Sequence, residues 1–264
     1  MKKELRIFFT ALMFLTRLPV PRMTDHSPEY LEKSTRYFPL IGWIVGGISA
    51  IVFLAFYRFL SPDLSLLASI IAGILTTGAF HEDGFADVCD AFGGGWTKEK
   101  ILEIMKDSRL GTYGTIGLVG ILGAKFLVLR DLLDLLTQRY TTLLFPVLVS
   151  LVAAHSISRF MAVVSIQFYP YVTPDDTSKA KPSAAKKLSG ASFLAAFFFA
   201  VVFFAFLPFR FLLIVPILVV ATILLNRYFA RWIGGHTGDC LGTVQQVTEI
   251  ICYLTMLVLW KFTW

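Results

Sequence analysis

Long apolar stretches recur along the chain without matching polar faces. Two of them are interrupted by a single charge, Lys125 or Glu249, and the others carry none. A helix needs about 17–25 apolar residues to cross a bilayer, and only helices or closed barrels satisfy their backbone in lipid. The pattern therefore predicts seven transmembrane helices. They are Phe38–Tyr57, Leu64–Phe80, Leu110–Leu129, Tyr140–Ser158, Leu188–Phe209, Phe211–Asn226 and Leu241–Trp260.

The composition agrees with a membrane protein. The 264 residues are 56% hydrophobic and 16% charged, with a mean hydropathy of +0.70, whereas a soluble chain carries about 25% charge. With seven spans, one side of the membrane has 17 Lys and Arg and the other has five. The richer side, which includes residues 81–109, is predicted to be cytoplasmic. The net charge of +6 is thus mainly a topology signal and does not indicate nucleic-acid binding. The three cysteines imply no disulfide framework.

Two shorter segments complete the predicted architecture. Ile7–Leu18 is too short to cross the membrane, and we interpret it as an interfacial or re-entrant helix. A signal sequence is the alternative, because basic residues precede this stretch, but no small-residue cleavage site follows. Apolar positions between residues 101 and 110 predict a cytoplasmic amphipathic helix. No linker divides the chain, so the sequence predicts one all-α integral-membrane domain over residues 1–264.

The densest group of ionisable residues follows the second predicted span. Asp83, Asp87 and Asp90 are spaced i, i+4, i+7, which places them within about 40° on one helical face. Like charges at this spacing repel, and their oxygens are ligands that Mg²⁺ and Mn²⁺ prefer. We therefore predict a divalent-metal site, against the alternative of a solvated acidic helix end. On the same helix His81 would point to nearly the opposite face and Glu82 to the side. Either the helix begins at Asp83, or His81 has a different role, such as supporting a metal ligand or acting as acid–base partner.

A polar segment precedes the third predicted span. It consists of Lys106, Asp107, Ser108 and Arg109. Cations, a hydroxyl and free N–H groups at a helix N-terminus predict a phosphate-binding site. The alternative is a positively charged flank at the membrane surface.

Isolated polar residues in the other spans are further candidates. Arg159 follows His155 at i+4 and either has a function or reaches the cytoplasmic interface. Asp239 lies in a glycine-rich turn, and Gln245 and Glu249 share a helical face beyond it. Because an ionisable group in lipid is costly, Glu249 must face the protein interior or a wet cavity.

Regularly spaced glycines and one polar loop give further predictions. Gly42 and Gly46 form a G-x-x-x-G pattern that predicts close helix packing. Glycines at every third position from 111 to 123 predict a span that is slim on several faces or partly unwound. The loop Tyr169–Gly190, which contains four lysines, either closes over an anionic substrate or is a solvated connector.

Two motifs carry a resemblance to a known family. Residues 81–90 match the pattern His-x-Asp-Gly-x-x-Asp-x-x-Asp, and residues 105–114 match Met-Lys-Asp-Ser-Arg-x-Gly-Thr-Tyr-Gly. In these motifs the chain resembles the cobalamin synthase family, also called adenosylcobinamide-GDP ribazoletransferases. Segments 14–21, 37–42 and 237–242 extend the resemblance over about residues 8–250. Ala91 departs from the glycine that is common in the family, which affects only the local turn.

The resemblance implies a multi-pass enzyme of the cell inner membrane whose active site faces the cytoplasm. Such an enzyme uses Mg²⁺ to join adenosylcobinamide-GDP to α-ribazole or α-ribazole 5′-phosphate and releases GMP. The expected partners are these substrates and the lipid bilayer, with no nucleic acid. A homo-oligomer, or an association with other cobalamin-assembly enzymes, is also considered.

From the motifs and the resemblance together we assign three sets of candidate residues. Catalytic roles are expected for Asp83, Asp87, Asp90, Asp239 and Glu249. Metal ligation is expected from Asp83, Asp87, Asp90 and Glu82. Substrate binding is expected from His81, Lys106, Asp107, Ser108, Arg109, Arg159 and Gln245.

Two other classes of protein are considered. A CDP-alcohol phosphatidyltransferase also places aspartates on a membrane helix, but its Asp-Gly-x-x-Ala-Arg signature is absent, because Phe85, Ala86 and Asp87 follow Gly84. A transporter would place charges near the middle of the membrane and usually shows internal repeats. Here the acidic residues cluster at one surface.

Overall fold

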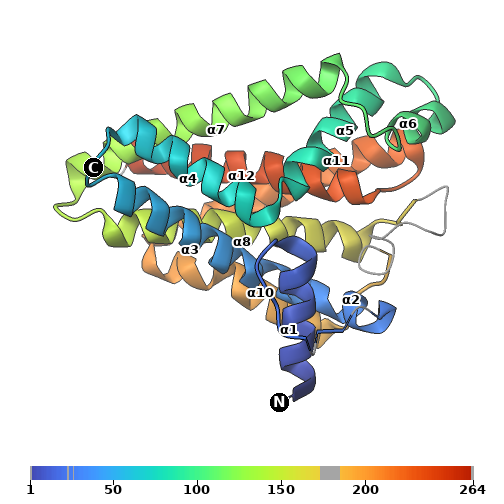
Figure 1. The fold of residues 1–264 in the computed structure, drawn as a ribbon, viewed down its shortest axis with the longest axis horizontal. Helices are drawn as coiled ribbons and strands as arrows, with labels where there is room; N and C mark the ends of the chain where they lie inside the picture. The colour runs from blue at the N-terminus through green and yellow to red at the C-terminus, as the bar shows by residue number, and fades with distance from the viewer. Residues whose placement is uncertain (1, 23, 26, 173–184, 263–264) are drawn as a thin grey trace.

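The computed structural model describes residues 2–22, 24–25, 27–172 and 185–262, and the described chain is helical apart from one isolated bridge between Tyr171 and His236. The α-helices, with the numbering of Figure 1, are α1 Lys2–Leu15, α2 Pro28–Ser34, α3 Phe38–Phe56, α4 Pro62–Thr77, α5 Phe80–Gly94, α6 Lys98–Ile104, α7 Thr112–Arg139, α8 Leu144–Phe168, α10 Gly190–Val201, α11 Ile214–Ile233 and α12 Gly238–Lys261. Short 3₁₀ helices are η1 Thr35–Tyr37, η2 Val202–Phe206 and η3 Phe209–Leu213. The prediction of an all-α protein is confirmed.

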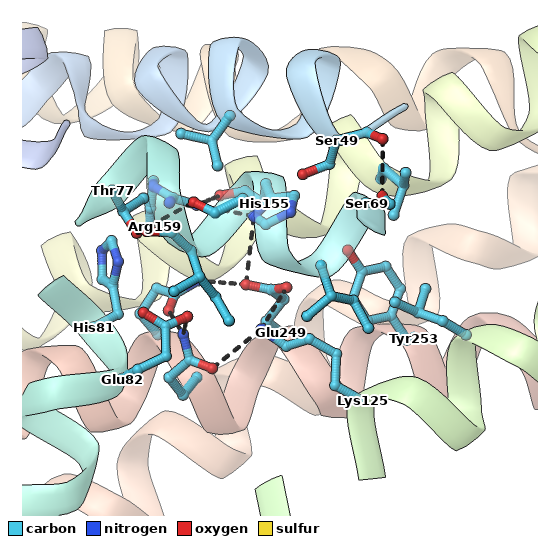
Figure 2. Close-up of a pocket in the computed structure, with 18 residues that line it drawn as sticks. Ser49, Ser69, Thr77, His81, Glu82, Lys125, His155, Arg159, Glu249 and Tyr253 are labelled. Atoms are coloured by element: carbon cyan, nitrogen blue, oxygen red, sulfur yellow. Dashed lines mark hydrogen bonds and ion pairs between the residues drawn. The ribbon is translucent and has the colours of Figure 1, made fainter. Parts of the chain in front are cut away.

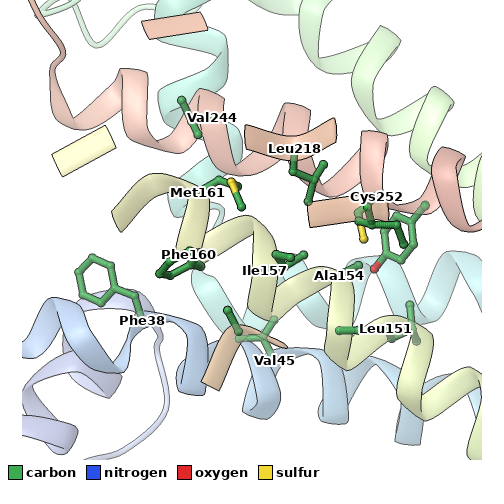
Figure 3. Close-up of a cluster of buried hydrophobic side chains, with 14 of the residues drawn as sticks. Phe38, Val45, Leu151, Ala154, Ile157, Phe160, Met161, Leu218, Val244 and Cys252 are labelled. Atoms are coloured by element: carbon green, nitrogen blue, oxygen red, sulfur yellow. The ribbon is translucent and has the colours of Figure 1, made fainter. Parts of the chain in front are cut away.

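Helix α8 forms the centre of the bundle. It packs against α3, α12, α10 and α11, and 94% of the 18-residue stretch that makes it apolar enough to cross a membrane is buried inside the bundle. Figure 3 shows apolar side chains of α8, such as Leu151, Ile157 and Met161, meeting Val45 of α3 and Leu218 of α11. Apart from a few Ser, His, Arg and Gln positions, α8 is apolar on every side. A helix without a polar face is expected to be surrounded by other helices, and α8 is.

Glycines set the closest helix contacts, as the sequence predicts. A methyl group on Gly42 would lie 2.5 Å from the carbonyl oxygen of His155, and one on Gly46 would lie 2.8 Å from Cα of Val152. The G-x-x-x-G pattern therefore brings the backbones of α3 and α8 together. Gly111, just before α7, and Gly114 and Gly117 within it lie against Asp90 and Cys89 of α5, whereas the glycines at 120 and 123 face open space. Since α7 is one continuous helix of 28 residues, this span is slim on one face and is not unwound.

The helices support a membrane protein but give a lower number of clear spans than the sequence suggests. Within the described ranges, four helical segments are long and apolar enough to cross a bilayer: Pro28–Phe56, Leu144–Phe168, Phe209–Ile233 and Gly238–Lys261. A fifth results if α4 and α5, which meet at an 88° bend, count as one span. The predicted stretch Leu188–Phe209 forms the 12-residue α10 followed by η2. The count of seven therefore stays a prediction.

The two shorter predicted helices are present with different ends. Helix α1 runs across the long helices near one end of the bundle (Figure 1), where Glu4 accepts hydrogen bonds from Arg36 at 2.7 Å and Tyr37 at 2.9 Å. Helix α6 has seven residues and ends at Ile104, so Leu110 lies outside it and is exposed. Most of the loop Tyr169–Gly190, residues 173–184, lies outside the described residues.

Candidate active site

A sharp bend between α4 and α5 positions the helix that carries the acidic residues. Gly78 and Ala79 both have left-handed backbone conformations, with φ of 67° and 59°, and the amides of both donate hydrogen bonds to the last turn of α4. A methyl group on Gly78 would lie 2.3 Å from Nε of Arg17, so glycine fits both the conformation and the space. Helix α5 consequently leaves α4 nearly at a right angle, and it begins at Phe80 and not at Asp83.

The acidic residues of α5 meet the start of α12. Gly84 allows this approach, because a methyl group there would lie 2.9 Å from Cα of Asp239. The carboxylate of Asp87 interacts electrostatically with those of Asp239, Asp83 and Asp90. In the part of the chain that the structure describes, no Lys or Arg forms an ion pair with Asp83, Asp87 or Asp239. Within the described ranges, three carboxylates from two helices therefore gather without a Lys or Arg side chain paired to them.

Asp90 has a different environment from the other two aspartates of α5. Its Oδ2 accepts a hydrogen bond from the backbone N–H of Gly111 at 2.7 Å, and its Oδ1 accepts one from Gly114 at 2.8 Å. These amides belong to the start of α7, whose first N–H groups have no partner within the helix. Asp90 thus caps α7 from a neighbouring helix and fixes α7 against α5.

Replacing Asp90 by alanine should therefore destabilise the protein by about 0.5–2 kcal/mol, the usual range for loss of a helix cap. Asparagine keeps a hydrogen-bond acceptor, so Asp90→Asn should retain most of the stability and activity. Thermal unfolding in detergent and GMP release by the same preparations measure the two properties. An Asp90→Asn variant that is stable but inactive would instead mark Asp90 as a metal ligand.

The polar segment before α7 is in the expected place but is internally paired. Arg109 donates to Asp107 through Nε at 3.0 Å and Nη2 at 2.6 Å, and its backbone N–H donates to Asp107 at 3.1 Å. These bonds from Arg109 lower the pKa of Asp107 to about 2. Asp107 therefore stays ionised through the neutral range, and only strong acidification removes the pair. Lys106, Ser108 and Arg109 are exposed, so an anion in solution can reach this segment.

A second polar cluster lies inside the helix bundle, on another side of α5 (Figure 2). Its centre is Glu249 of α12, whose side chain is 1% exposed. Lys125 of α7 lies 3.2 Å from Oε1 of Glu249, and Nδ1 of His155 lies 3.4 Å from Oε2. Gln245 also donates to Oε2 at 2.5 Å. The expectation that Glu249 faces the interior is confirmed.

Two glutamines connect this cluster to α5. Gln246 Nε2 donates to Glu82 at 3.0 Å and to Oε1 of Gln245 at 2.9 Å, while its own Oε1 accepts from Lys125 at 3.1 Å. Glu82 is thus buried and turned away from the acidic residues of its own helix. It lies beside Asp83 in the sequence, but the structure does not bring it to Asp83 and Asp87.

Arg159 belongs to the interior as well and does not reach an interface. It is 2% exposed, and Nη1 donates to the carbonyl oxygen of His155 at 2.8 Å, while Nε has no hydrogen-bond partner in the described chain. Glu82, Glu249, Arg159 and Lys125 line a common cavity of about 20 Å³, which holds about one water molecule. The two negative charges of the glutamates and the two positive charges of Arg159 and Lys125 balance one another.

The structure therefore separates the predicted site residues into two groups. Asp83, Asp87 and Asp239 lie together at the surface of the α5–α12 contact. Met105, directly before Lys106, accepts a hydrogen bond from Thr237, two residues before Asp239. The second group is interior and comprises Glu82, Arg159, Gln245 and Glu249. Because a helix rises about 1.5 Å per residue, Glu249 lies about 15 Å along α12 from Asp239, so the two cannot contact the same small ion. His81, 5% exposed, lines the interior cavity together with Glu82 and Arg159.

The residues suit a divalent cation in charge and in donor type but do not form a closed coordination site. Among the described residues, no three His, Cys, Asp or Glu side chains are arranged to hold a metal ion. However, Asp83, Asp87 and Asp239 are hard oxygen donors of like charge, and no described Lys or Arg pairs with them; hard oxygen donors are the ligands that Mg²⁺ prefers. Asp239 was expected to be catalytic, and its place beside Asp87 makes it the third candidate ligand in preference to Asp90 or Glu82.

Comparison with known proteins assigns the chain to a family. The sequence model of the cobalamin-5-phosphate synthase family matches residues 7–257. The chain belongs to this family. The resemblance found in the motifs is thereby confirmed over nearly the whole chain, and no solved structure matches it.

Curated relatives agree with the assignment. An adenosylcobinamide-GDP ribazoletransferase of Shewanella frigidimarina is 41% identical over 255 residues, which cover 97% of this chain and 95% of the relative. The protein of the same name from Leptospira interrogans is 42% identical, with 99% and 98% covered. The one from Shewanella oneidensis is 39% identical, with 97% and 95% covered. Because both chains are covered almost completely, the shared region contains nearly all of the described helices; the family model begins within α1 and ends within α12.

Proposed function

We propose that the chain is a membrane-embedded, Mg²⁺-dependent adenosylcobinamide-GDP ribazoletransferase. It would join adenosylcobinamide-GDP to α-ribazole or α-ribazole 5′-phosphate and release GMP. The observation that carries the proposal is the group of Asp83, Asp87 and Asp239, which has no Lys or Arg partner among the described residues and lies within residues 7–257, the part of the chain that the family model matches.

The reaction is a phosphoryl transfer. A ribose hydroxyl of the ribazole attacks the phosphorus that bears the corrinoid arm, a new O–P bond forms, and the bond to the GMP phosphate breaks. Mg²⁺ bound at the aspartates would supply positive charge to the diphosphate oxygens. The contribution of the chain is to hold the reacting groups in line and to stabilise the charge that develops.

Each group of residues has a part in this scheme. Asp83, Asp87 and Asp239 would hold the cation. Lys106 and Arg109, which are exposed, would bind the departing phosphate, and Arg109 would then exchange Asp107 for the anion. Bidentate contacts of this kind are typical of arginine with phosphate. Glu249 is tied to Lys125 and His155 inside the bundle, so we assign it to holding α7, α8 and α12 in register and not to the chemistry.

The membrane arrangement is proposed from charge and helix positions. The excess of Lys and Arg on the side that carries α5 and α6 supports a multi-pass protein of the inner membrane with the site facing the cytoplasm. Seven crossings remain our proposal, with α4, α7 and α10 added to the four clear spans. Self-association and association with other cobalamin-assembly enzymes stay predictions.

The proposal is tested by incubating membranes that contain the protein with adenosylcobinamide-GDP and α-ribazole and measuring GMP. We expect GMP and the joined corrinoid in equal amounts with Mg²⁺, and loss of both after chelation with EDTA. Re-addition of Mg²⁺ or Mn²⁺ should restore the rate, whereas Ca²⁺, which prefers more ligands and longer bonds, should restore little. Full activity after complete chelation would contradict the metal assignment, and the absence of GMP under every condition would contradict the reaction.

A further inference from the structure

A large cavity lies at the end of the bundle opposite the acidic residues. Its volume is about 970 Å³, near the top of the range of about 300–1,000 Å³ that is usual for ligand pockets. It is formed by the end of α3, the end of α7 and the start of α8, and Figure 1 shows the turn between α7 and α8 far from α5 and α6. Since a helix rises about 1.5 Å per residue, Thr137 in the cavity wall lies about 35 Å along α7 from Gly114, which contacts Asp90. The cavity is therefore separate from the proposed reaction.

The cavity lies where two apolar spans end. Helix α3 ends at Phe56 and α8 begins at Leu144, and both helices belong to segments that are long and apolar enough to cross a bilayer. Leu144 and Phe145 line the cavity and are themselves exposed. In a membrane, these side chains face the acyl chains of the surrounding lipid, because exposed apolar groups at the end of a span lie in hydrocarbon. A molecule in the cavity can therefore contact water at one end and acyl chains at the other.

The polar part of the cavity wall suits an anion. Arg58 is the single charged side chain among the described residues that line it. Within the described ranges, its guanidinium makes no ion pair and no hydrogen bond. The hydroxyls of Thr141 and Thr142, which also line the cavity, have no hydrogen-bond partner in the described chain either. Arginine binds a phosphate through two parallel N–H bonds, and hydroxyls can donate further ones, so these three side chains are free to hold a phosphate group.

Two tyrosines line the cavity as well. Tyr57 stacks on Phe53 with ring centroids 5.3 Å apart, and Tyr140 meets Trp260 edge-on at 5.9 Å. These contacts hold both rings at the ends of the spans. Tyrosine is enriched at the boundary between membrane and water, because its ring is apolar and its hydroxyl is polar. The tyrosines therefore place the cavity at the depth of the lipid headgroups.

From these observations we propose that the cavity, which we call the lipid cavity, binds one anionic phospholipid of the leaflet opposite the acidic residues. Its phosphate would lie against Arg58, Thr141 and Thr142, and its acyl chains would lie along Leu144 and Phe145. A lipid fits better than a free phosphate, because one wall of the cavity is polar and the other is apolar. Basic pockets between membrane helices bind headgroups of this kind. The lipid would join the ends of α3, α7 and α8 and so stabilise the bundle, with no part in the reaction.

Native mass spectrometry of the full-length protein in a neutral detergent tests the role of charge. For the first bound lipid, we expect a Kd for phosphatidylglycerol at least about fivefold lower than that for phosphatidylcholine with the same acyl chains. Arg58→Gln should remove this preference, whereas Arg58→Lys, which keeps the charge but loses the two parallel N–H bonds, should retain part of it. Arg130→Gln is the matched control. Arg130 is a half-exposed arginine that pairs with Asp63 outside the cavity, and its replacement should leave the preference unchanged.

Two further measurements separate a lipid from a free anion. Ala55 also lines the cavity, and Ala55→Trp, which fills it and keeps every cation, should raise the Kd for phosphatidylglycerol about tenfold or more, as a steric change in an apolar pocket does. Glycerol 3-phosphate in large excess should not displace the lipid, because it has no acyl chains.

Thermal unfolding in the same detergent identifies the variants that are folded, and only these are compared. Equal binding of the two lipids, an unchanged preference in Arg58→Gln, a lost preference in Arg130→Gln, or displacement by glycerol 3-phosphate would each overturn the lipid cavity. None of these results would bear on the proposed function, which is tested separately by GMP release.

Discussion

Replacing Asp87 by asparagine should lower kcat by about 1,000-fold while the protein still inserts and folds. Asp87 lies at the centre of the acidic group, within electrostatic range of Asp83 and Asp239. A neutral amide of the same shape removes the charge that a divalent cation needs. The loss corresponds to several kcal/mol of transition-state stabilisation, at about 1.4 kcal/mol per factor of ten. GMP release at saturating substrates measures it.

The variant is informative because folding and chemistry respond differently. Removing one of several mutually repelling carboxylates should leave the thermal unfolding midpoint equal or raise it, since like charges destabilise the folded state. Asp131→Asn is the matched control: Asp131 is an exposed aspartate of α7 away from the site, and its loss should change neither rate nor stability. A fully active Asp87→Asn would refute both the metal site and the role of Asp87.

Hydrophobic patterning predicts the helices well because burial in lipid and burial in the bundle both select for the same residues. Gly42 and Gly46 are predicted and found at the close contact of α3 and α8, since a small residue is required wherever two backbones approach. The bend between α4 and α5 is not predicted. It depends on left-handed conformations at both Gly78 and Ala79, and alanine disfavours this conformation, so the residue type at 79 does not indicate it.

The composition of the site is predicted less well than its location. Helical spacing places Asp83, Asp87 and Asp90 on one face, but it contains no information about the N–H groups of α7 that engage Asp90. Nor does it show that Asp239, more than 150 residues further on, takes a place beside Asp87. Glu82 and Asp83 are neighbours in sequence, yet a rotation of about 100° per residue sends them to different surroundings.

One signal for the interior cluster is present in the sequence. Lys125 and Glu249 are the single charges of two otherwise apolar stretches. A lone charge inside a membrane protein is stable only if it is paired or hydrogen-bonded, so two lone charges of opposite sign predict a pair. The structure places them 3.2 Å apart. Gln246, which links Lys125 to Glu82, has no comparable signal, because an uncharged polar residue is common within a helix.

Breaking this pair should have the largest effect on stability. Replacing Lys125 by methionine, which has a similar length, removes the cation nearest to the buried Glu249 and leaves its contacts with His155 and Gln245. Loss of one partner from a buried ion pair costs about 3–5 kcal/mol, so the unfolding midpoint in detergent should fall well below that of the unsubstituted protein. Arg130→Met is the control. Arg130 lies on α7, as Lys125 does, but its ion pair with Asp63 of α4 is half-exposed, so losing it should cost only about 0–1 kcal/mol of stability.

Combining Lys125→Met with Glu249→Gln should recover most of the lost stability. The double variant leaves no unpaired charge between α7 and α12, and glutamine can still accept the hydrogen bond from Gln245 that Glu249 accepts at 2.5 Å. Replacing a whole buried ion pair by neutral groups is often neutral or stabilising. The coupling energy from the two single variants and the double variant should therefore be large, about 2 kcal/mol or more in the direction of rescue. Additive losses would show that Lys125 and Glu249 act independently, and the cluster would then not be the element that holds the two helices in register beneath the acidic site.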